Sequence, residues 1–418
     1  MNEIIDIYNL IKKDSNTYLD MLNMTANENI ISENVRNVLS NNLLNKYHIG
    51  IAEKIQDKKL IEKDGLAFQN LVNVNRLEIE ARKKANEMYK TQFVDFRLLT
   101  GVHAVMALLL CATDPNDLIY ILHPEKTGHF ATVPLIETSG RRYKYIPWNP
   151  LNYNIDINAL EKEIEEEMPR MVLLDSATPI CSYPVEAIRS AISKETILVY
   201  DVSHTLGLFL SDNFVNPIQA GCDIIIGNTH KTFFGPHKAI MAFKNYEYGK
   251  SISDKITLTT ISSQQTNQSL ALYIAMLEMH QFGKEYSNQV LLNGKVLSKY
   301  LEDLGFEIFK VKNEFPVNHM VLIKQNELVT DALELGERLM EHNISINVKV
   351  IFGERMLRIG VQDITRRGMK EEEMKGIANL IYCIAKNKSY DTNLKEKVKK
   401  MSNDFKNIEY SFDKIIEE

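Results

Sequence analysis

The sequence predicts an α/β protein with a large domain built on a mostly parallel β-sheet, followed by a smaller α+β domain at the C-terminus. Between Arg76 and about residue 245, apolar runs of strand length alternate with stretches of helix length. These runs are not interrupted by alternating polar residues, which is typical of strands buried on both faces of a parallel sheet. After about residue 290 the apolar runs are shorter and lie between two helical patterns, as in a small α+β domain.

Composition narrows the class of protein. The 418 residues are 44% apolar and 25% charged with only 11 prolines, so neither disorder nor a fibrous repeat is expected. The 49 basic and 55 acidic residues give a net charge of −6, which argues against nucleic-acid binding. Apolar runs such as 107–110 are far shorter than the roughly 20 residues of a membrane-spanning helix. With no basic segment before an early apolar stretch, we expect a cytoplasmic protein that binds neither nucleic acid nor membrane.

The cysteines do not form a recognisable pattern. They are far apart, mostly within apolar runs, with no Cys-x-x-Cys pair: Cys111, Cys181, Cys222 and Cys383. We therefore expect small buried hydrophobic residues rather than a disulfide framework or a metal site.

The large domain is preceded by an N-terminal segment. Residues 1–50 alternate helical patches with polar breaks, and the large domain is expected over 51–288. It opens on a charged run, 51–65, whose simplest interpretation is a solvated loop or a short surface helix.

The small domain and a tail complete the chain. The small domain, 289–388, is expected to hold helices at 289–304 and 370–386 and strands at 306–309, 319–323 and 344–347. In the tail, 389–418, apolar residues from Leu394 to Ile415 follow at alternating intervals of four and three, which predicts an amphipathic helix. Such a stripe needs a partner surface, on the protein's own body or on a second subunit.

Polar residues follow several of the predicted parallel strands. Asp175-Ser176 comes after 171–174, Asp201 after 197–200 and Gly227-Asn228 after 223–226. Ligands of open α/β sheets bind outside the carboxyl ends of the strands. The sequence therefore places the candidate site among these residues.

Lys231 is the most informative of these candidates. It follows the third of those strands in the stretch 228–236. Burial disfavours a charged lysine and so makes its amine nucleophilic enough to form a Schiff base. The alternative is an ordinary surface lysine after a strand.

Two further features suggest a bound coenzyme. Asp201 is placed to keep a heteroaromatic nitrogen protonated, which turns the ring into an electron sink, or else it caps the next helix. The stretch Thr100-Gly101-Val102 precedes a helical run, and the amide groups at such a helix N-terminus favour a phosphate. Thr100 has an equally simple interpretation as an ordinary N-cap.

Together these residues resemble the fold-type I, aspartate aminotransferase-like enzymes that use pyridoxal 5′-phosphate (PLP), and within them serine hydroxymethyltransferase. The similarity covers about residues 20–385. The resemblance implies that the sheet of the large domain has seven strands. Its motifs are Ala26-Asn27-Glu28-Asn29, Asn45-Lys46-Tyr47, Thr100-Gly101, Gly128-His129, Asp175-Ser176-Ala177, Asp201-Val202-Ser203-His204, Thr229-His230-Lys231-Thr232, Asn318-His319 and Leu357-Arg358-Ile359-Gly360.

The resemblance implies a role in coenzyme binding for the matching residues. Lys231 would hold PLP as an internal aldimine, Asp201 would pair with the pyridinium nitrogen, and His204 would lie near the phenolic oxygen. His129 would stack on the ring, and Ser176 would approach the coenzyme's oxygen atoms. The phosphate and remaining contacts would come from Thr100, Gly101, the Val102 backbone, His230 and Thr266.

The resemblance also implies a substrate site. Arg358 would clamp the substrate carboxylate through two parallel hydrogen bonds, and Tyr47 and Asn27 would complete the site. The resemblance implies five catalytic residues: Lys231, Asp201, His129, His204 and Glu28. The base that removes the β-hydroxyl proton is left open among Glu28, His129, His204 and a water molecule.

The sequence departs from the family where folate is bound. In the region that begins with Asn45, the folate-using members of the family have a sequence similar to Asn-Lys-Tyr-Ala-Glu-Gly-Tyr. In this chain Ile49 stands in place of the glutamate. Isoleucine neither donates nor accepts a proton. The tyrosines that follow are missing as well, and the glycine-rich loop that a neighbouring subunit offers to the phosphate is replaced by 262–267.

We therefore expect a PLP-dependent aldolase or transaldolase that acts on a threonine-like or serine-like amino acid and an aldehyde without folate. Cleavage of the Cα–Cβ bond would leave a glycyl quinonoid, which a second aldehyde could trap. The alternatives are a tetrahydrofolate-dependent serine hydroxymethyltransferase, another PLP reaction on the same fold, and a non-catalytic relative. The fold type implies a homodimer in which the neighbour supplies Tyr47 and 262–267.

Overall fold

The computed structural model describes residues 2–50, 53–63, 65–211, 213–387 and 389–413. The chain forms two compact units. Unit 1 consists of Met1–Ile30 and Asn288–Glu409, and unit 2 consists of Ile31–Ser287 and Tyr410–Glu418.

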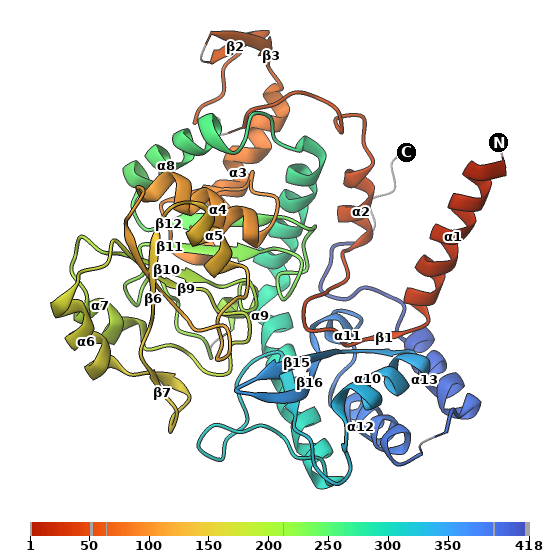
Figure 1. Cartoon of the computed structure of the whole chain (residues 1–418). Coiled ribbons are helices and arrows are strands. Elements are labelled where there is room, and N and C mark those ends of the chain that lie inside the picture. Colours follow the sequence, from red (N-terminus) through yellow and green to blue (C-terminus); the bar gives the residue numbers. More distant parts are fainter. Residues whose placement is uncertain (1, 51–52, 64, 212, 388, 414–418) are drawn as a thin grey trace. The chain divides into compact units, whose positions relative to one another are not determined.

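Unit 2 is built on a seven-stranded sheet in the order β4-β12-β11-β10-β9-β5-β6 (Figure 1). Only β12 runs antiparallel to its neighbours β11 and β4, and the other adjacent pairs are parallel. This confirms the predicted mostly parallel sheet. The strands are β4 (Phe93–Asp95), β5 (Leu118–Ile121), β6 (Arg142–Tyr145), β9 (Met171–Leu174), β10 (Ile197–Asp201), β11 (Ile224–Asn228) and β12 (Ala239–Phe243).

Helices cover this sheet and account for its apolar strands. α4 packs against α8, β11 and β12, and Leu108 of α4 shares a fully buried cluster with Val199, Ile226 and Met241. Strands buried in this way need no polar face, which is why the runs are uninterrupted. The α-helices that lie wholly within the unit are α2 (Glu33–Leu39), α3 (Val72–Tyr89), α4 (Gly101–Ala112), α5 (Thr132–Thr138), α6 (Ile157–Glu166), α7 (Val185–Ala191) and α8 (Tyr246–Thr259).

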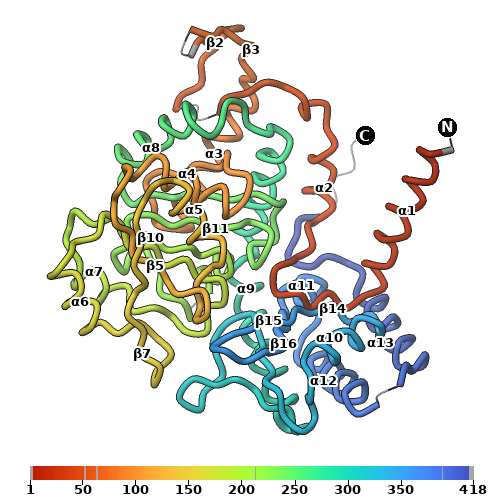
Figure 2. Tube along the Cα trace, in the orientation of Figure 1, coloured from red at the N-terminus to blue at the C-terminus, as the bar shows by residue number. Residues whose placement is uncertain are grey.

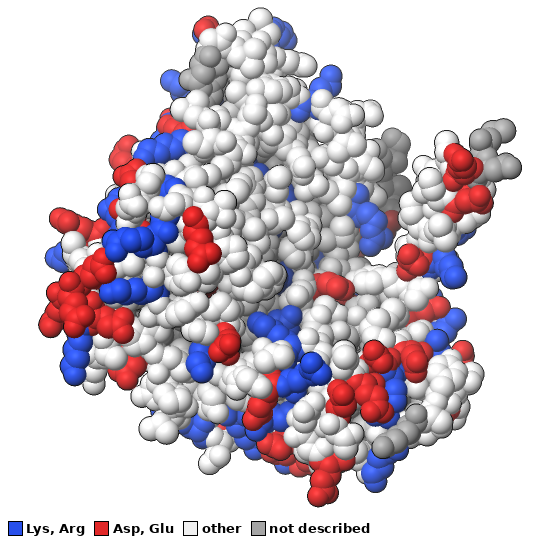
Figure 3. Space-filling model, in the orientation of Figure 1, with Lys and Arg blue, Asp and Glu red and all other residues white. Residues whose placement is uncertain are grey.

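The surface of unit 2 is acidic over α6 and α7 (Figure 3). α6 buries Leu160 and Ile164 and turns its glutamates outward, as an amphipathic surface helix does. This patch is a solvated helix face.

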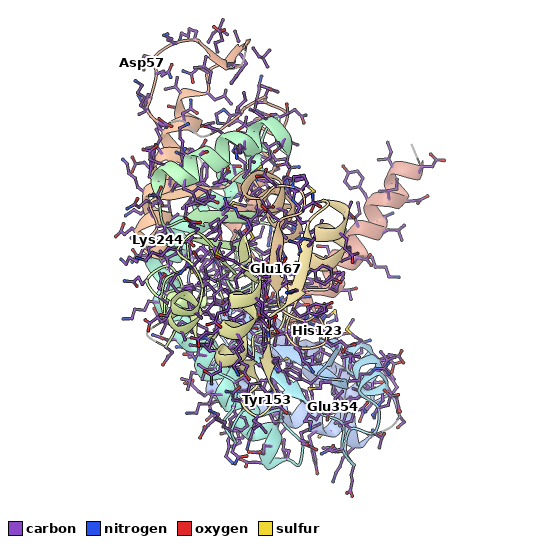
Figure 4. The ribbon with its side chains drawn as sticks, turned by 60° about the vertical axis from the view of Figure 1, so that its left-hand side comes forward. Asp57, His123, Tyr153, Glu167, Lys244 and Glu354 are labelled. Carbon is purple, nitrogen blue, oxygen red and sulfur yellow. The ribbon has the colours of Figure 1, made fainter. Side chains whose placement is uncertain are left out.

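The charged run after residue 50 differs from its prediction. We expected a loop or short helix over 51–65, but β2 (Leu60–Lys63) and β3 (Leu66–Gln69) form an antiparallel hairpin. The dipeptide Asp64-Gly65 between the two strands is a strong hairpin turn signature. The hairpin reaches out from the body of unit 2 (Figure 2), and Asp57 marks the same projection in Figure 4.

Unit 1 contains a three-stranded antiparallel sheet in the order β13-β16-β15, which confirms the smaller C-terminal α+β part. β1 (Leu22–Asn23) pairs in parallel with β14 (Ile344–Ser345). The other elements are α1 (Asn2–Leu19), β13 (Met320–Ile323), α10 (Ala332–Glu341), β15 (Asn347–Ile351), β16 (Glu354–Gly360), α11 (Gln362–Arg366), α12 (Glu371–Lys386) and α13 (Thr392–Asp404).

Two predicted elements of this part differ. The strand expected at 306–309 is reduced to an isolated bridge between Ile308 and Ile323. The helix expected at 289–304 is the end of a much longer helix, α9 (Thr266–Asp303).

The tail is helical only in its first part. α13 ends at Asp404, with Leu394 and Val398 buried in unit 1. Beyond it, the Glu409 amide donates to the Arg366 carbonyl over 2.9 Å, so the chain leaves the helix to dock on α11. Of the predicted stripe, Ile415 lies outside the described residues.

The cysteine expectation needs one correction. Cys111 and Cys222 are buried and Cys181 is half-buried, but Cys383 is exposed on α12. Cys383 stands in an apolar run of the sequence, but its side chain lies on the exposed face of α12. Among the described residues, no helix is both long and apolar enough to span a membrane.

Candidate active site

The carboxyl ends of the central strands of unit 2 border one pocket with an empty volume of about 400 Å³. Asp201 ends β10, Asn228 ends β11, and Ser176 follows β9. This is the edge where the strand-end argument placed the candidate site. The pocket is lined by Gly101, Val102, Val105, His129, Ala131, Thr132, Leu135, Ser176, Ala177, Asp201, Ser203, Asn228 and Lys231.

Lys231 lies in this pocket with only 9% of its surface exposed. Its Nζ is 3.1 Å from Nε2 of His204. The His204 backbone is fixed in turn, because the Thr232 hydroxyl donates to its carbonyl over 3.1 Å. The surface-lysine alternative is therefore wrong, and a buried amine with an imidazole partner is suited to nucleophilic chemistry.

Asp201 lines the same pocket as Lys231. Its Oδ1 accepts the Ser203 amide over 2.8 Å, so the carboxylate is oriented by the turn that follows β10. Ser203 in turn accepts the Asn228 amide over 3.0 Å. Adjacent strand ends are thereby linked across the floor of the pocket.

Asn228 is one of the strand-end residues expected at the site but was given no role there, and Ser203 is a pocket residue that was not singled out. Oδ1 of Asn228 accepts the Gly101 amide over 2.7 Å, which ties β11 to the N-terminus of α4. Asn228 satisfies the same strand-end criterion that identified Asp201, and this signal was sufficient to find it.

The N-terminus of α4 confirms the N-cap interpretation of Thr100 and borders the pocket. Thr100 is an N-cap, because its Oγ1 accepts the His103 amide over 3.0 Å. Gly101 and Val102 line the pocket whereas Thr100 does not. The first turn therefore presents an anion-favouring helix end to the pocket, and a phosphate contact by Thr100 stays a prediction.

His129 and Ser176 also line the pocket. Nδ1 of the half-buried His129 accepts the Ala131 amide over 3.2 Å, which leaves Nε2 as the protonated nitrogen of the neutral ring. The Ser176 hydroxyl accepts a hydrogen bond from the Tyr183 hydroxyl over 3.1 Å. Both side chains line the pocket, as their predicted roles require.

His230 does not line the pocket. Its ring stacks on His237 with centroids 3.8 Å apart. Burial, with the charges of His237 and Lys231, lowers the pKa of His230 to about 3. A neutral stacked imidazole supports the lysine-bearing loop, and direct coenzyme contact stays a prediction.

Tyr47 and Thr266 are also absent from the lining of this pocket. Tyr47 packs edge-on against Phe68, 5.4 Å between centroids, and the Thr266 hydroxyl donates to the Lys46 carbonyl over 3.3 Å. The segments 45–50 and 262–267 meet directly, because the Gln264 amide donates to the His48 carbonyl over 2.8 Å. They therefore lie together in unit 2, apart from the pocket lining, and Gln264 and Thr266 are buried there.

Arg358 and Asn27 meet in unit 1. One terminal nitrogen of Arg358 donates to Oδ1 of Asn27 over 2.9 Å and to Oδ1 of Asn347 over 3.0 Å. Asn347 faces Arg358 in the register of β15 and β16. Burial lowers the pKa of Arg358 to about 10, so the guanidinium is still charged at neutral pH and is held by two neutral amides.

Glu28 lies on the same unit beside a buried acid. The Gln362 side chain fixes the Glu28 backbone by donating to its carbonyl over 2.6 Å. Partial burial and the nearby Asp363 carboxyl raise the pKa of Glu28. This shift brings Glu28 closer to the range useful for proton transfer.

Comparison with known proteins confirms the predicted resemblance. The sequence profile of serine hydroxymethyltransferase matches residues 2–381. The serine hydroxymethyltransferase of Archaeoglobus fulgidus is 28% identical over 419 aligned residues, which cover 98% of this chain and 93% of that protein. The fluorothreonine transaldolase of Streptantibioticus cattleyicolor is 27% identical over 394 residues, which cover 94% of this chain and 62% of that enzyme.

A solved structure shows the same fold. The crystal structure of L-threonine transaldolase from Pseudomonas fluorescens in its internal aldimine state matches with a TM-score of 0.90 and 28% identity. The match covers 99% of this chain and 94% of that one, and it confirms the fold-type I architecture. Profile and fold agree over most of the chain, and we conclude that the chain belongs to the serine hydroxymethyltransferase family of PLP-dependent enzymes.

Proposed function

We propose that this chain is a folate-independent aldolase or transaldolase that uses PLP to cleave or form the Cα–Cβ bond of a β-hydroxy-α-amino acid such as threonine or serine. The glycine unit left by cleavage is released or joined to a second aldehyde. The observation that carries the proposal is the single pocket lined by Lys231, Asp201 and the N-terminus of α4. Ile49, in place of the family's folate-site glutamate, supports the exclusion of folate.

The pocket residues fit PLP. Lys231 offers the amine that binds the aldehyde, Asp201 offers a carboxylate to the ring nitrogen, and Gly101 opens a helix end suited to a phosphate. A Cβ at position 101 would lie 2.6 Å from Nδ2 of Asn228, so only glycine leaves this approach open. When bound, PLP supplies an electron sink that stabilises negative charge developing at the substrate Cα.

Arg358 is the proposed anchor of the amino-acid substrate. Asn27 and Asn347 orient its guanidinium, which leaves a planar fork suited to a carboxylate. Holding the carboxylate decides which bond at Cα stands perpendicular to the coenzyme ring, and that is the bond the electron sink weakens.

The proton of the β-hydroxyl needs an acceptor from the chain or from water. The protein candidates are His204, whose Nε2 is 3.1 Å from Nζ of Lys231, Glu28, whose pKa is raised by burial and Asp363, and His129, which lines the pocket. Because Nε2 of the neutral His129 ring already carries a proton, His129 is placed to donate there, and His204 and Glu28 are the better acceptors.

A homodimer completes the proposed site. The segments that contain Tyr47 and residues 262–267 contact each other and do not line the pocket of their own chain, which supports their donation to a second copy. α1 supports an association too, because six of its large apolar side chains are more than half exposed: Ile4, Ile5, Ile7, Tyr8, Leu10 and Ile11.

The second candidate is a tetrahydrofolate-dependent serine hydroxymethyltransferase. The similarity to the Archaeoglobus fulgidus enzyme of that name favours it. Against it stands Ile49, which is only 7% exposed and has no group that exchanges protons.

The deciding experiment compares two assays on the same PLP-loaded protein. We expect L-threonine plus a second aldehyde to give acetaldehyde and a new β-hydroxy amino acid without folate. The K231A variant is the control and is expected to lose both this reaction and covalent trapping of PLP by borohydride. Turnover of serine that depends on added tetrahydrofolate, with no reaction of threonine, would establish the second candidate instead.

A further inference from the structure

Asp175 is a buried acid beside the pocket whose two oxygens are held by backbone amides. Only 1% of the surface of Asp175 is exposed. Oδ1 accepts the Leu122 amide over 3.1 Å, and Oδ2 accepts the His129 amide over 3.3 Å. The Thr132 hydroxyl is a further donor to this carboxylate. Asp175 thus links the end of β5 to two residues that line the pocket, His129 and Thr132.

The loop between these donors is short and closely pinned. It begins at His123, labelled in Figure 4, and ends at α5. The Ala177 amide donates to the Thr127 carbonyl over 2.8 Å, and Gly128 forms a bridge with Ser176. The position of the His129 ring therefore depends on how firmly the loop is fastened to the segment after β9.

Among the described residues, no cationic side chain compensates for the burial of the Asp175 carboxylate. Within the described residues, no basic side chain forms a salt bridge with Asp175, and burial raises its pKa to about 7. A buried charge without a cationic partner is costly. Here the compensation comes only from donors of the His129 loop and its flanks, which indicates that holding this loop is the role of Asp175.

We propose that Asp175 is a positioning residue, which fastens the Leu122 and His129 amides and so sets the contact of His129 with the coenzyme ring. This inference rests on the proposed function, because it presumes that the pocket binds PLP. Asp175 itself touches neither the coenzyme nor the substrate.

The protonation of Asp175 then affects the loop. The ionised carboxylate accepts from all of its donors, whereas a protonated carboxyl turns one oxygen into a donor that faces an amide N–H. The titratable groups on the surrounding segments are His123, Glu125, Lys126, His129, Cys181 and Tyr183. Burial raises the pKa of Tyr183 well above its usual value, and the His123 ring lies tilted against Tyr145 with centroids 4.2 Å apart.

The test uses D175N, which keeps the size of the side chain but cannot accept at both positions. In the coenzyme-free protein we expect hydrogen exchange in the 122–132 segment to accelerate by about ten- to a hundredfold, the loss expected for hydrogen bonds to a buried charge. In the PLP-loaded protein we expect weaker coenzyme circular dichroism, and the wild-type change of this signal between pH 6 and 8 is expected to vanish.

A matched control and a second background make the test specific. D117N removes a carboxylate that accepts the Asp114 amide over 2.8 Å just before β5, remote from the pocket, and is expected to leave the coenzyme signal unchanged. In an H129A background, D175N is expected to change the coenzyme signal no further, because the ring it positions is gone.

Two results would overturn the inference. One is a D175N protein that binds PLP with unchanged dichroism, pH profile and loop exchange. The other is an effect of D175N of equal size in the H129A background. Failure of the wild-type protein to bind PLP at Lys231 would instead contradict the proposed function, and the exchange measurement on the coenzyme-free protein would still test the fastening of the loop.

Discussion

At the scale of single residues, the buried charges of this protein fall into two kinds. Asp95 is paired with a charge, because it accepts from Arg97 over 2.7 Å. Arg358 and Asp175 form hydrogen bonds with neutral amides. Removing one partner of a buried charge pair such as Asp95–Arg97 is strongly destabilising.

At this scale, the sequence predicts the site residues that follow buried strands or belong to a recognisable motif. Lys231 and Asp201 were predicted from their place after buried strands, and they line one pocket. Asn347 was not predicted, because its contact with Arg358 arises from the cross-strand register of β15 and β16. That register depends on pairing, which a single strand sequence does not specify.

Replacing Arg358 by alanine is expected to raise the KM for the amino acid about a hundredfold, since truncating one partner of a buried charge pair costs about 2–5 kcal/mol. PLP is expected to stay bound. N347A, which removes only one orienting hydrogen bond, serves as the milder comparison, with an effect of about tenfold. Steady-state kinetics and the absorbance of bound coenzyme measure both effects, and loss of that absorbance in R358A would refute the role.

Asp95 leads to a prediction about stability. Burial alone would raise its pKa, but Arg97 and Ser253 lower it to about 2. Because the folded pKa lies below the usual 3.8, the carboxylate contributes stability that is present above pH 4 and lost as the pH falls towards 2. D95N is expected to lower the free energy of unfolding by about 3 kcal/mol at pH 7. Urea unfolding at several pH values measures it, and a difference from wild type that does not shrink below pH 4 would count against it.

At the scale of elements, the predictable parts are those whose burial leaves a pattern. β9, β10 and β11 were read directly from apolar runs, because both faces of each strand are covered. The β2–β3 hairpin was missed because its charged residues outweighed the short turn signature. The predicted tail helix is too long. The apolar spacing suits a longer helix, but the chain leaves the helix after Asp404, and the Glu409 amide then donates to the Arg366 carbonyl.

The N-terminus of α4 leads to a prediction about PLP affinity. G101A is expected to lower the affinity for PLP about tenfold or more, because the added Cβ would lie 2.6 Å from Nδ2 of Asn228 and would displace the helix end. The double variant G101A/N228A relieves that clash and is expected to recover part of the affinity. Titration of the coenzyme-free protein with PLP gives both values, and equal affinity of G101A and wild type would exclude this use of the helix.

At the scale of the whole molecule, the pocket of one chain lacks the two predicted contributors that a neighbouring copy would supply. Tyr47 and Thr266 lie together elsewhere on unit 2. The resemblance implies that a neighbouring copy supplies both residues. Neither lines the pocket of its own chain, and their donation to a second copy stays a prediction.

Complementation tests this sharing between copies. K231A and Y47F are each expected to be nearly inactive as homodimers. Mixed dimers formed after dissociation and reassociation are expected to recover about a quarter of wild-type activity, because half of the dimers are mixed and each has one intact site. Light scattering verifies the dimer, and no recovery in mixtures that do form would contradict sharing of Tyr47.

The bridge at Gly128 has a consequence for how this protein tolerates change. A Cβ at this position would meet the Leu122 carbonyl oxygen at 2.3 Å, and backbone cannot yield as a flexible side chain does. If every amino acid were tried at position 128 and functional clones were selected, glycine alone should survive. Even alanine, the smallest alternative, would push apart two stretches of chain that must stay in contact.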